Sequence, residues 1–299
     1  EIMSSDWSSD VCSSDLSAYA KERLQGRAAG GGSDLSQPAD PIMVHPDVRR
    51  MLLDQKAWIE GARAFLLTGA TLIDTEHRHG DAAEREKAAD RIALLIPVLK
   101  AVLTDQGFAL AVQAQQVLGG HGYVKEWELE QIVRDARIAM IYEGANGIQA
   151  LDLVGRKLPM KGGAPLMAWF ADLRAFIKAH EGDASLKAEF LDPLRAAAKD
   201  MQAAVEFFMA EGAKNPNAAL AGATDFLHLF GHVAIGWCWA AMAQTTRAAL
   251  DAGTGDPAFY EAKLATGRYY MQRLLPETGF RLARIRSGAE TVMDLEIQR

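Results

Sequence analysis

The stretch from Gln116 to Gln149, QVLGGHGYVKEWELEQIVRDARIAMIYEGANGIQ, holds two glycine-containing turns separated by a segment with helical periodicity. The first turn is GGHG at 119–122 and the second is EGANG at 143–147. Between them, apolar residues recur at spacings of three and four, which predicts a one-sided helix of roughly a dozen residues. These residues are Leu129, Ile132, Val133, Ala136 and Met140.

Glu143 is the candidate chemical group of this stretch. It follows the apolar run from Ile138 to Tyr142, so we expect its carboxylate to be held against apolar surface. A carboxylate shielded from water is a stronger base, which makes Glu143 a candidate general base. The alternative is structural, because an acidic side chain just before a helix starting at about Asn146 would cap that helix.

Composition places the chain among ordinary globular proteins. It has 299 residues, 49% hydrophobic and 24% charged, enough for one large or two ordinary domains. The net charge of -7, the pI near 5.6 and the lack of a basic stripe argue against nucleic-acid binding. Cys12 and Cys238 cannot form a disulfide framework. No signal peptide or apolar run of about eighteen residues is present, so we expect a cytoplasmic protein with no transmembrane segment.

Helical patterns fill the remainder of the chain, and almost no segment alternates with a period of two. We expect a helix at 18–27, a long helix from Asp47, and a second at 83–118, interrupted near Pro97 and antiparallel to the first. Further helices are expected at 148–158, 165–180, 184–213, 216–252 and 256–275. Short connections between long helices predict an all-α fold, an antiparallel helical bundle followed by a second bundle.

The segment Pro159–Gly163 is the strongest linker signal, which predicts one domain at 17–160 and another at 165–299. The first sixteen residues contain Ser-Ser-Asp three times and match nothing downstream. We expect residues 1–16 to be a non-native or disordered segment, with Trp7 and Cys12 carrying no function. The native part would then begin near Ser17.

An aromatic row in the last domain is expected to face the interior or another subunit: Phe207, Phe208, Phe226, Leu229, Phe230, Val233, Trp237 and Trp239.

Several kinds of catalytic site are unsupported by the sequence. His77 and His79 lie in a polar turn, and His228 and His232 lack the intervening glutamate of a zinc-protease helix, so no metal site is expected. Nucleophile-elbow and phosphate-loop motifs are absent. The glycines at 119–122 do not follow a strand, and on their own they indicate the C-terminal cap of a helix.

Taken together, the motifs carry a resemblance. QVLGGHGY at 116–123, RDA at 134–136, IYEG at 141–144 and IQ at 148–149 resemble, in order and spacing, the C-terminal signature of the acyl-CoA dehydrogenases. The resemblance extends back to YAKERLQ at 19–25 and forward to Leu158, about half of the chain. The part after about 165 is similar to an additional helical domain of one subgroup, which includes enzymes similar to 3-methylmercaptopropionyl-CoA dehydrogenase.

The resemblance implies an FAD-dependent α,β-dehydrogenation of an acyl-CoA thioester. Glu143 matches the family's base, whose backbone N–H also polarises the thioester carbonyl, and Gly144 matches a substrate-binding position. A guanidinium suits a diphosphate, and glycine lets the backbone approach a cofactor closely. Ala145 replaces a frequent threonine and so removes a hydroxyl. The positions matching FAD contacts are Arg23, Gln25, Gln116, Val117, Leu118, Gly119, Gly120, Ala145 and Gly147.

The resemblance also implies partners. These are an acyl-CoA substrate, an electron-transfer flavoprotein or similar acceptor, and further copies of the chain in a dimer or tetramer, since family cofactors contact a neighbouring subunit. Family members place a helical and a β-domain before this region, so we expect a C-terminal fragment that is inactive alone. Two alternatives stay open: an acyl-CoA oxidase, and a non-catalytic helical assembly module.

Overall fold

A computed structural model describes residues 15–32, 34–212 and 214–294 of the chain. Residues 1–14, and with them Trp7 and Cys12, lie outside the described part. The expectation of disorder is wrong for Asp15 and Leu16, because residues 15–22 are helical and Leu16 is buried in a core. A non-native origin of residues 1–16 stays a prediction. The described residues contain helices and one isolated bridge, Leu24 to Pro41, but no strand, which confirms the all-α fold.

Two long helices, joined by a turn at residues 79–81, are the longest elements of the fold. They are α2 (Pro46–Arg78) and α3 (Ala82–Leu118), the latter continuous through Pro97. A proline inside a helix costs about 3 kcal/mol. Pro97 lies between the buried Leu95 and Val98, and this packing holds the helix together where an interruption was predicted.

The structure divides into two compact units, and each contains a part of both long helices. Unit 1 comprises residues 1–60 and 104–142, and unit 2 comprises residues 61–103 and 143–299. In unit 1 the antiparallel pairing is shown by two hydrogen bonds. Gln55 Nε2 donates to the Leu110 carbonyl at 2.8 Å, and Gln113 Nε2 donates to Asp54 Oδ2 at 3.0 Å.

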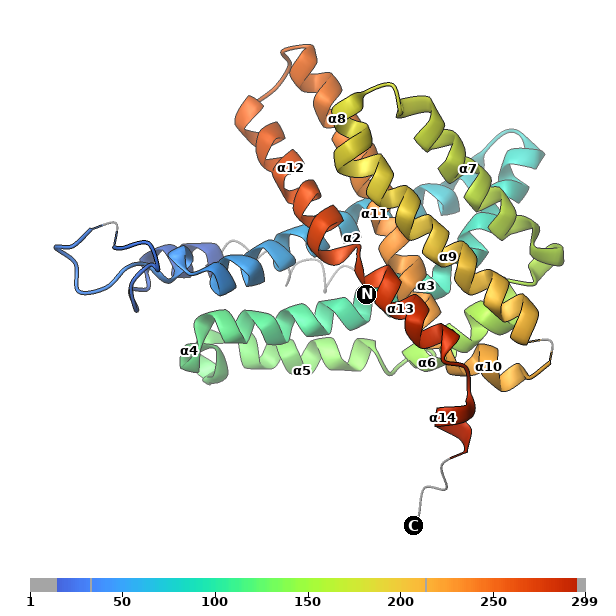
Figure 1. Cartoon of the computed structure of the whole chain (residues 1–299), viewed down its shortest axis with the longest axis horizontal. Helices are drawn as coiled ribbons and strands as arrows, with labels where there is room; N and C mark the ends of the chain where they lie inside the picture. The colour runs from blue at the N-terminus through green and yellow to red at the C-terminus, as the bar shows by residue number, and fades with distance from the viewer. Residues whose placement is uncertain (1–14, 33, 213, 295–299) are drawn as a thin grey trace. The chain divides into compact units, whose positions relative to one another are not determined.

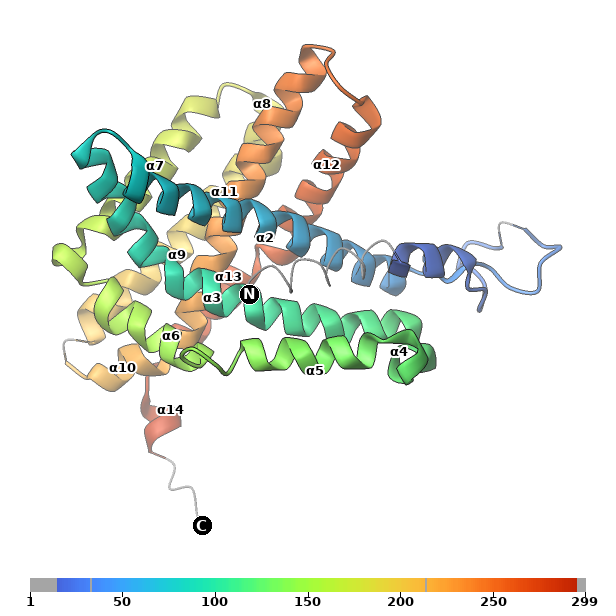
Figure 2. The same cartoon turned by 180° about the vertical axis from the view of Figure 1, so that it is seen from behind.

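Unit 1 also contains short elements. They are η1 (Ile42–Val44), α4 (Gly120–Tyr123), η2 (Lys125–Trp127) and α5 (Leu129–Ala139). Both views show α5 running back beside the C-terminal part of α3 (Figures 1 and 2). The expected one-sided helix is confirmed, since Leu129 packs with Val117 and Leu118 in the core of this unit. The core also holds Leu16, Met51 and Ala114.

Unit 2 is a helical bundle built around α11 (Ala223–Asp251), which packs against α9 (Asp192–Glu211), α12 (Pro257–Tyr269) and α13 (Glu277–Arg286) (Figure 1). Most of the predicted aromatic row is buried there, which confirms its interior role, while Phe207 and Trp237 are half-buried. The other elements are α6 (Asn146–Asp152), η3 (Leu153–Lys157), η4 (Met160–Gly163), α7 (Ala164–His180), α8 (Ala184–Leu186), η5 (Lys187–Leu191), α10 (Pro216–Ala221), η6 (Tyr270–Leu274) and α14 (Glu290–Met293).

Length and composition alone would allow α3 and α11 to cross a membrane. Packing accounts for the apolar character of α11, because 78% of its most apolar window is buried, as in the core helix of a bundle. In α3 the buried share is 44%, and it includes Val98 and Ala101 in unit 2.

The predicted linker at 159–163 is a turn with three consecutive positive φ angles, at Lys161, Gly162 and Gly163. A domain boundary at this turn stays a prediction. The compact units follow a different division, since residues 61–103 belong with everything after Tyr142.

Candidate functional site

Glu143 lies in a tight loop between α5 and α6. Its φ angle is 51° and that of Gly144 is 83°, so both residues adopt the left-handed conformation. Glycine tolerates this conformation, whereas for a residue with a side chain it costs about 1–2 kcal/mol. Glu143 therefore occupies a backbone position that only surrounding contacts can maintain.

Three side chains of unit 2 supply those contacts. Lys100 Nζ donates to the Gly144 carbonyl at 2.9 Å and to Asn146 Oδ1 at 2.7 Å. Asn146 Nδ2 donates to the Ala101 carbonyl at 3.2 Å, and Gln149 Nε2 donates to the Glu143 carbonyl at 3.2 Å. The loop is thus fastened to α3 on one side and to α6 on the other.

The Glu143 side chain is exposed, so the expectation that apolar surface holds it is wrong for this chain. The reason is that the preceding run is itself at the surface, with Ile141 50% and Tyr142 40% exposed. The capping alternative is also wrong, because Ala145 is the N-cap of α6 and no side chain makes the capping hydrogen bond. The carboxylate is free to meet a ligand.

The turn at 119–122 ends α3, which confirms its role as a helix cap. Gly119 has a φ of 60°, and its N–H donates to the Gln116 carbonyl at 3.2 Å. No atom lies within 4 Å of the position that a Cβ would take at Gly119 or Gly120, so another molecule has room to approach this backbone. Gln116 is exposed beside it, whereas the side chains of Val117 and Leu118 are buried in the core. Those two residues can offer a cofactor only backbone atoms.

The segment with Arg23 and Gln25 lies at the same end of unit 1. Tyr19, one turn before Arg23, donates its hydroxyl to the Leu118 carbonyl at 3.3 Å, and the Arg23 N–H donates to the Tyr19 carbonyl at 2.8 Å. The side chains of Arg23 and Gln25 are exposed. An exposed guanidinium and an open glycine backbone each fit the negative charge of a dinucleotide cofactor.

The expected site residues thus fall into two groups. Arg23, Gln25 and residues 116–120 belong to unit 1, whereas Glu143, Gly144, Ala145 and Gly147 belong to unit 2. In unit 2, Gly147 and Ala145 are exposed at the start of α6.

An aromatic cluster beside the first turn was missed by sequence reasoning. The rings of His121 and Trp127 stack with centroids 5.0 Å apart, and Tyr19 meets both edge-on. The Tyr19 hydroxyl and His121 Nδ1 are 3.1 Å apart. The concentration of aromatic residues around a glycine turn was the available signal, and both His121 and Trp127 are exposed enough to contact a ligand.

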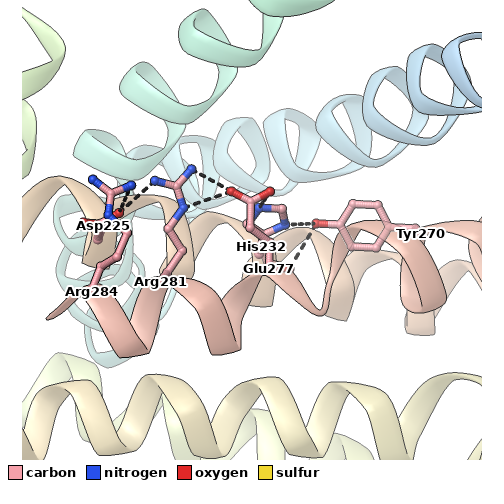
Figure 3. Close-up of polar contacts among 6 residues, drawn as sticks. All are labelled: Asp225, His232, Tyr270, Glu277, Arg281 and Arg284. Atoms are coloured by element: carbon pink, nitrogen blue, oxygen red, sulfur yellow. Dashed lines mark hydrogen bonds and ion pairs between the residues drawn. The ribbon is translucent and has the colours of Figure 1, made fainter. Parts of the chain in front are cut away.

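A second polar cluster, also missed, lies inside unit 2 and joins α11, η6 and α13 (Figure 3). Arg281 Nη1 donates to Asp225 Oδ1 at 2.9 Å, and Arg281 Nη2 donates to Glu277 Oε1 at 2.6 Å. His232 Nε2 lies 3.5 Å from Glu277 Oε2, and the Tyr270 hydroxyl donates to the His232 carbonyl at 3.2 Å. The six side chains drawn are Asp225, His232, Tyr270, Glu277, Arg281 and Arg284.

Burial and hydrogen bonding set the protonation of this cluster. Burial lowers the pKa of His232, which is 1% exposed, and raises the pKa of Tyr270 well above its usual value. Hydrogen bonding to His232, followed by the contact with Arg281, lowers the pKa of Glu277 to about 2. His228 and His232 are both buried on α11. Among the described residues no three potential metal ligands come together.

Comparison with known proteins identifies the family. The model for "Acyl-CoA dehydrogenase, C-terminal domain" matches residues 35–158, and the model for "Acetyl-CoA dehydrogenase C-terminal like" matches residues 169–296. The chain belongs to the acyl-CoA dehydrogenase family. The two models leave a gap between residues 158 and 169, which contains the predicted linker.

Relatives within the acyl-CoA dehydrogenase family match most of the chain. The 3-methylmercaptopropionyl-CoA dehydrogenase of Ruegeria pomeroyi is 36% identical over 92% of the chain and 46% of its own length. The broad-specificity linear acyl-CoA dehydrogenase FadE5 of Mycobacterium tuberculosis is 36% identical over 86% of the chain and 44% of its own length. The chain therefore spans about half the length of the curated relatives it matches.

The fold is shared with a solved acyl-CoA dehydrogenase. The structure of the Bacillus anthracis enzyme complexed with FAD has a TM-score of 0.72 at 19% identity, over 94% of this chain and 47% of that chain. The likeness shows a common fold.

Proposed function

We propose that this chain is the C-terminal part of an FAD-dependent acyl-CoA dehydrogenase in which Glu143 is the base that removes the α-proton of an acyl-CoA thioester. The observation that carries the proposal is the conformation of the loop. An exposed carboxylate is held in a strained left-handed turn within a chain of this family, and the IYEG motif around it resembles the family's motif that carries the base.

The two hydrogens that leave the substrate go to two different acceptors. The α-proton goes to the Glu143 carboxylate as a carbon–carbon double bond forms between the α- and β-carbons. FAD, when bound, accepts the β-hydrogen as a hydride. The backbone N–H of Glu143 would donate to the thioester carbonyl, where charge develops as the proton leaves. Because Gly144 has no side chain, it leaves room for the thioester beside the base.

The remaining residues would hold the cofactor. Arg23 would pair with the pyrophosphate of FAD, and the open backbone at Gly119 and Gly120 would lie against its adenine half. Support comes from the exposure of these groups at one end of unit 1 and from the Bacillus anthracis acyl-CoA dehydrogenase, whose structure is a complex with FAD. Because relatives are about twice as long, we infer that the parent protein supplies further contacts to cofactor and substrate.

Glu143→Gln in the full-length parent protein tests the proposal. Loss of the base should lower the rate of dye reduction with acyl-CoA substrates by roughly 10²–10⁴-fold, with the cofactor still bound. Glu128→Gln is a matched control, because Glu128 is also exposed and also has a positive φ, of 60°. Undiminished dye reduction by the Glu143→Gln protein would show that this carboxylate is not the base.

We also propose that the parent protein is a homo-oligomer and that its reduced cofactor delivers electrons to an electron-transfer flavoprotein or a similar acceptor. Support for both is the family membership of the chain. Peroxide formation in stoichiometric yield, with oxygen as the acceptor, would identify an oxidase instead. A monomer on light scattering would contradict the assembly.

A further inference from the structure

Lys100 stands out in the sequence of α3. It is the only charged residue in the stretch IALLIPVLKAVL at 92–103, and the remaining residues of that stretch are apolar. In a helix packed inside a bundle, a lysine at such a position is retained where its ammonium finds oxygen partners. Its partners here are the carbonyl of Gly144 and the side chain of Asn146, both in the loop that carries Glu143.

The helix beneath Lys100 is a rigid support. Ala101 and Val102, the next two residues, are fully buried. Val102 Cγ2 lies 2.6 Å from the position that a Cβ would take at Gly231, so the backbones of α3 and α11 approach closely there. The lysine stem therefore starts from a part of the bundle core that packing prevents from shifting.

Two independent bonds transmit this rigidity to the loop. The ammonium holds the Gly144 carbonyl, and charged donors make hydrogen bonds roughly twice as strong as neutral ones. The Asn146 amide closes a second link, since its Oδ1 accepts from Lys100 while its Nδ2 donates to the Ala101 carbonyl. Lys100 thereby holds the peptide between Gly144 and Ala145, and the bond from Gln149 to the Glu143 carbonyl holds the preceding peptide, between Glu143 and Gly144.

We propose that Lys100 is a positioning residue that holds the Glu143–Gly144 turn in its left-handed conformation and so sets the direction of the Glu143 carboxylate. The proposal rests on the proposed function of Glu143 as the base. In this role Lys100 acts through the Gly144 carbonyl and Asn146. Displacing a reacting group by about 1 Å can cost roughly 10²-fold in rate, so a released turn should slow proton removal.

The test compares Lys100→Met and Lys100→Arg in the full-length parent protein. Met keeps the length and apolar stem but donates no hydrogen bond, and we expect it to lower kcat by about 10–100-fold with KM for acyl-CoA within about 3-fold. Arg can donate to both oxygens and should restore most of kcat. Lys161→Met is the matched control, because the Lys161 ammonium also makes two hydrogen bonds within unit 2, to Glu86 and to Asp90, each at 2.8 Å.

A structural measurement on the same proteins separates positioning from general destabilisation. Hydrogen–deuterium exchange of the peptide covering residues 140–150 should be faster in Lys100→Met and unchanged in Lys161→Met. If Lys100→Met does not fold, Asn146→Ala, which removes one link, should lower kcat with faster exchange of the same peptide.

Each outcome decides one of the two proposals. A kcat within about 2-fold of wild type for Lys100→Met, or for Asn146→Ala in its place, overturns the role of Lys100 even if Glu143→Gln is inactive. An active Glu143→Gln protein overturns the base assignment whatever Lys100 does. If kcat of Lys100→Arg is as low as that of Lys100→Met, positioning through the Gly144 carbonyl and Asn146 Oδ1 is also contradicted.

Discussion

The three glycines of the 119–122 turn differ in what they require. A Cβ at Gly122 would lie 2.7 Å from Cα and from the carbonyl oxygen of Gln115, whereas a Cβ at Gly120 would meet nothing within 4 Å. We predict that Gly122→Ala destabilises the chain by about 1–3 kcal/mol, because the neighbouring atoms are backbone and cannot rotate away. Gly120→Ala, the matched control, should stay within about 0.5 kcal/mol of wild type. Urea unfolding of both variants measures the difference, and equal stabilities would refute the close approach.

Single residues were predictable where a local motif identified them. Glu143 and the 119–122 turn could be located because their neighbours in sequence form a recognisable pattern. The exposure of Glu143 and its attachment to Lys100 could not, because both depend on which distant segment of chain packs beside the loop. The sequence signal for this attachment was Lys100 itself, a single lysine in an apolar stretch of α3. Its position does not indicate which residues it would contact.

At the scale of helices, the cluster joining α11 and α13 makes stability depend on pH. Burial lowers the pKa of His232 below its ordinary 6.5, with His228 and Arg281 adding to this and Glu277 opposing it. Around and below pH 6.5 His232 therefore binds more protons in the unfolded chain than in the folded one. Its contribution to the free energy of unfolding is fully present above that pH and is lost as the pH falls through it. Glu277, with its pKa lowered to about 2, adds a second loss only as the pH falls below 4.5.

We therefore predict that the free energy of unfolding decreases between about pH 7.5 and about pH 5.5, and that His232→Gln removes much of this decrease. His77→Gln, at an exposed histidine of α2 in the same unit, is the control and should keep the wild-type dependence. Urea unfolding of the wild type and of both variants at the two pH values gives one difference in unfolding free energy for each protein. An unchanged pH dependence in His232→Gln would exclude His232 as its source.

Most helices were predictable from periodicity and from local end signals. Asn215 and Asp256 each cap the helix that follows with a side-chain hydrogen bond, and each stands before a proline in the first turn, a pattern typical of a helix start. The helix predicted at 216–252 is divided at Gly222 into α10 and α11. α13 escaped prediction because it is rich in arginine and has few apolar residues. Its contacts with α9 and α11 hold it in place, together with the ion pair between Arg281 and the buried Asp225. All of these partners lie far from α13 in sequence.

At the scale of the whole chain, the family models and the compact units divide the sequence differently. The models separate residues 35–158 from residues 169–296, whereas unit 2 combines residues 61–103 with residues 143–299. The second division follows packing. The position that a Cβ would take at Gly61 lies 2.6 Å from side-chain atoms of Ile235 and Trp239, so the first long helix and α11 share one core.

This shared core predicts that the first family domain is not stable by itself. A chain ending at Met160 would lose α11 and expose Val102, which packs against Gly231, and full burial of such a side chain contributes about 1.5–3 kcal/mol. We expect this truncated chain to aggregate or to unfold without cooperativity, as followed by circular dichroism on heating. A chain ending at Ala289 is the control, since it removes α14, which contains no buried residue, and should unfold like the whole chain. If the chain ending at Met160 melts cooperatively near the temperature of the intact chain, the boundary at 160–165 separates independently stable domains and the shared core contributes little to either.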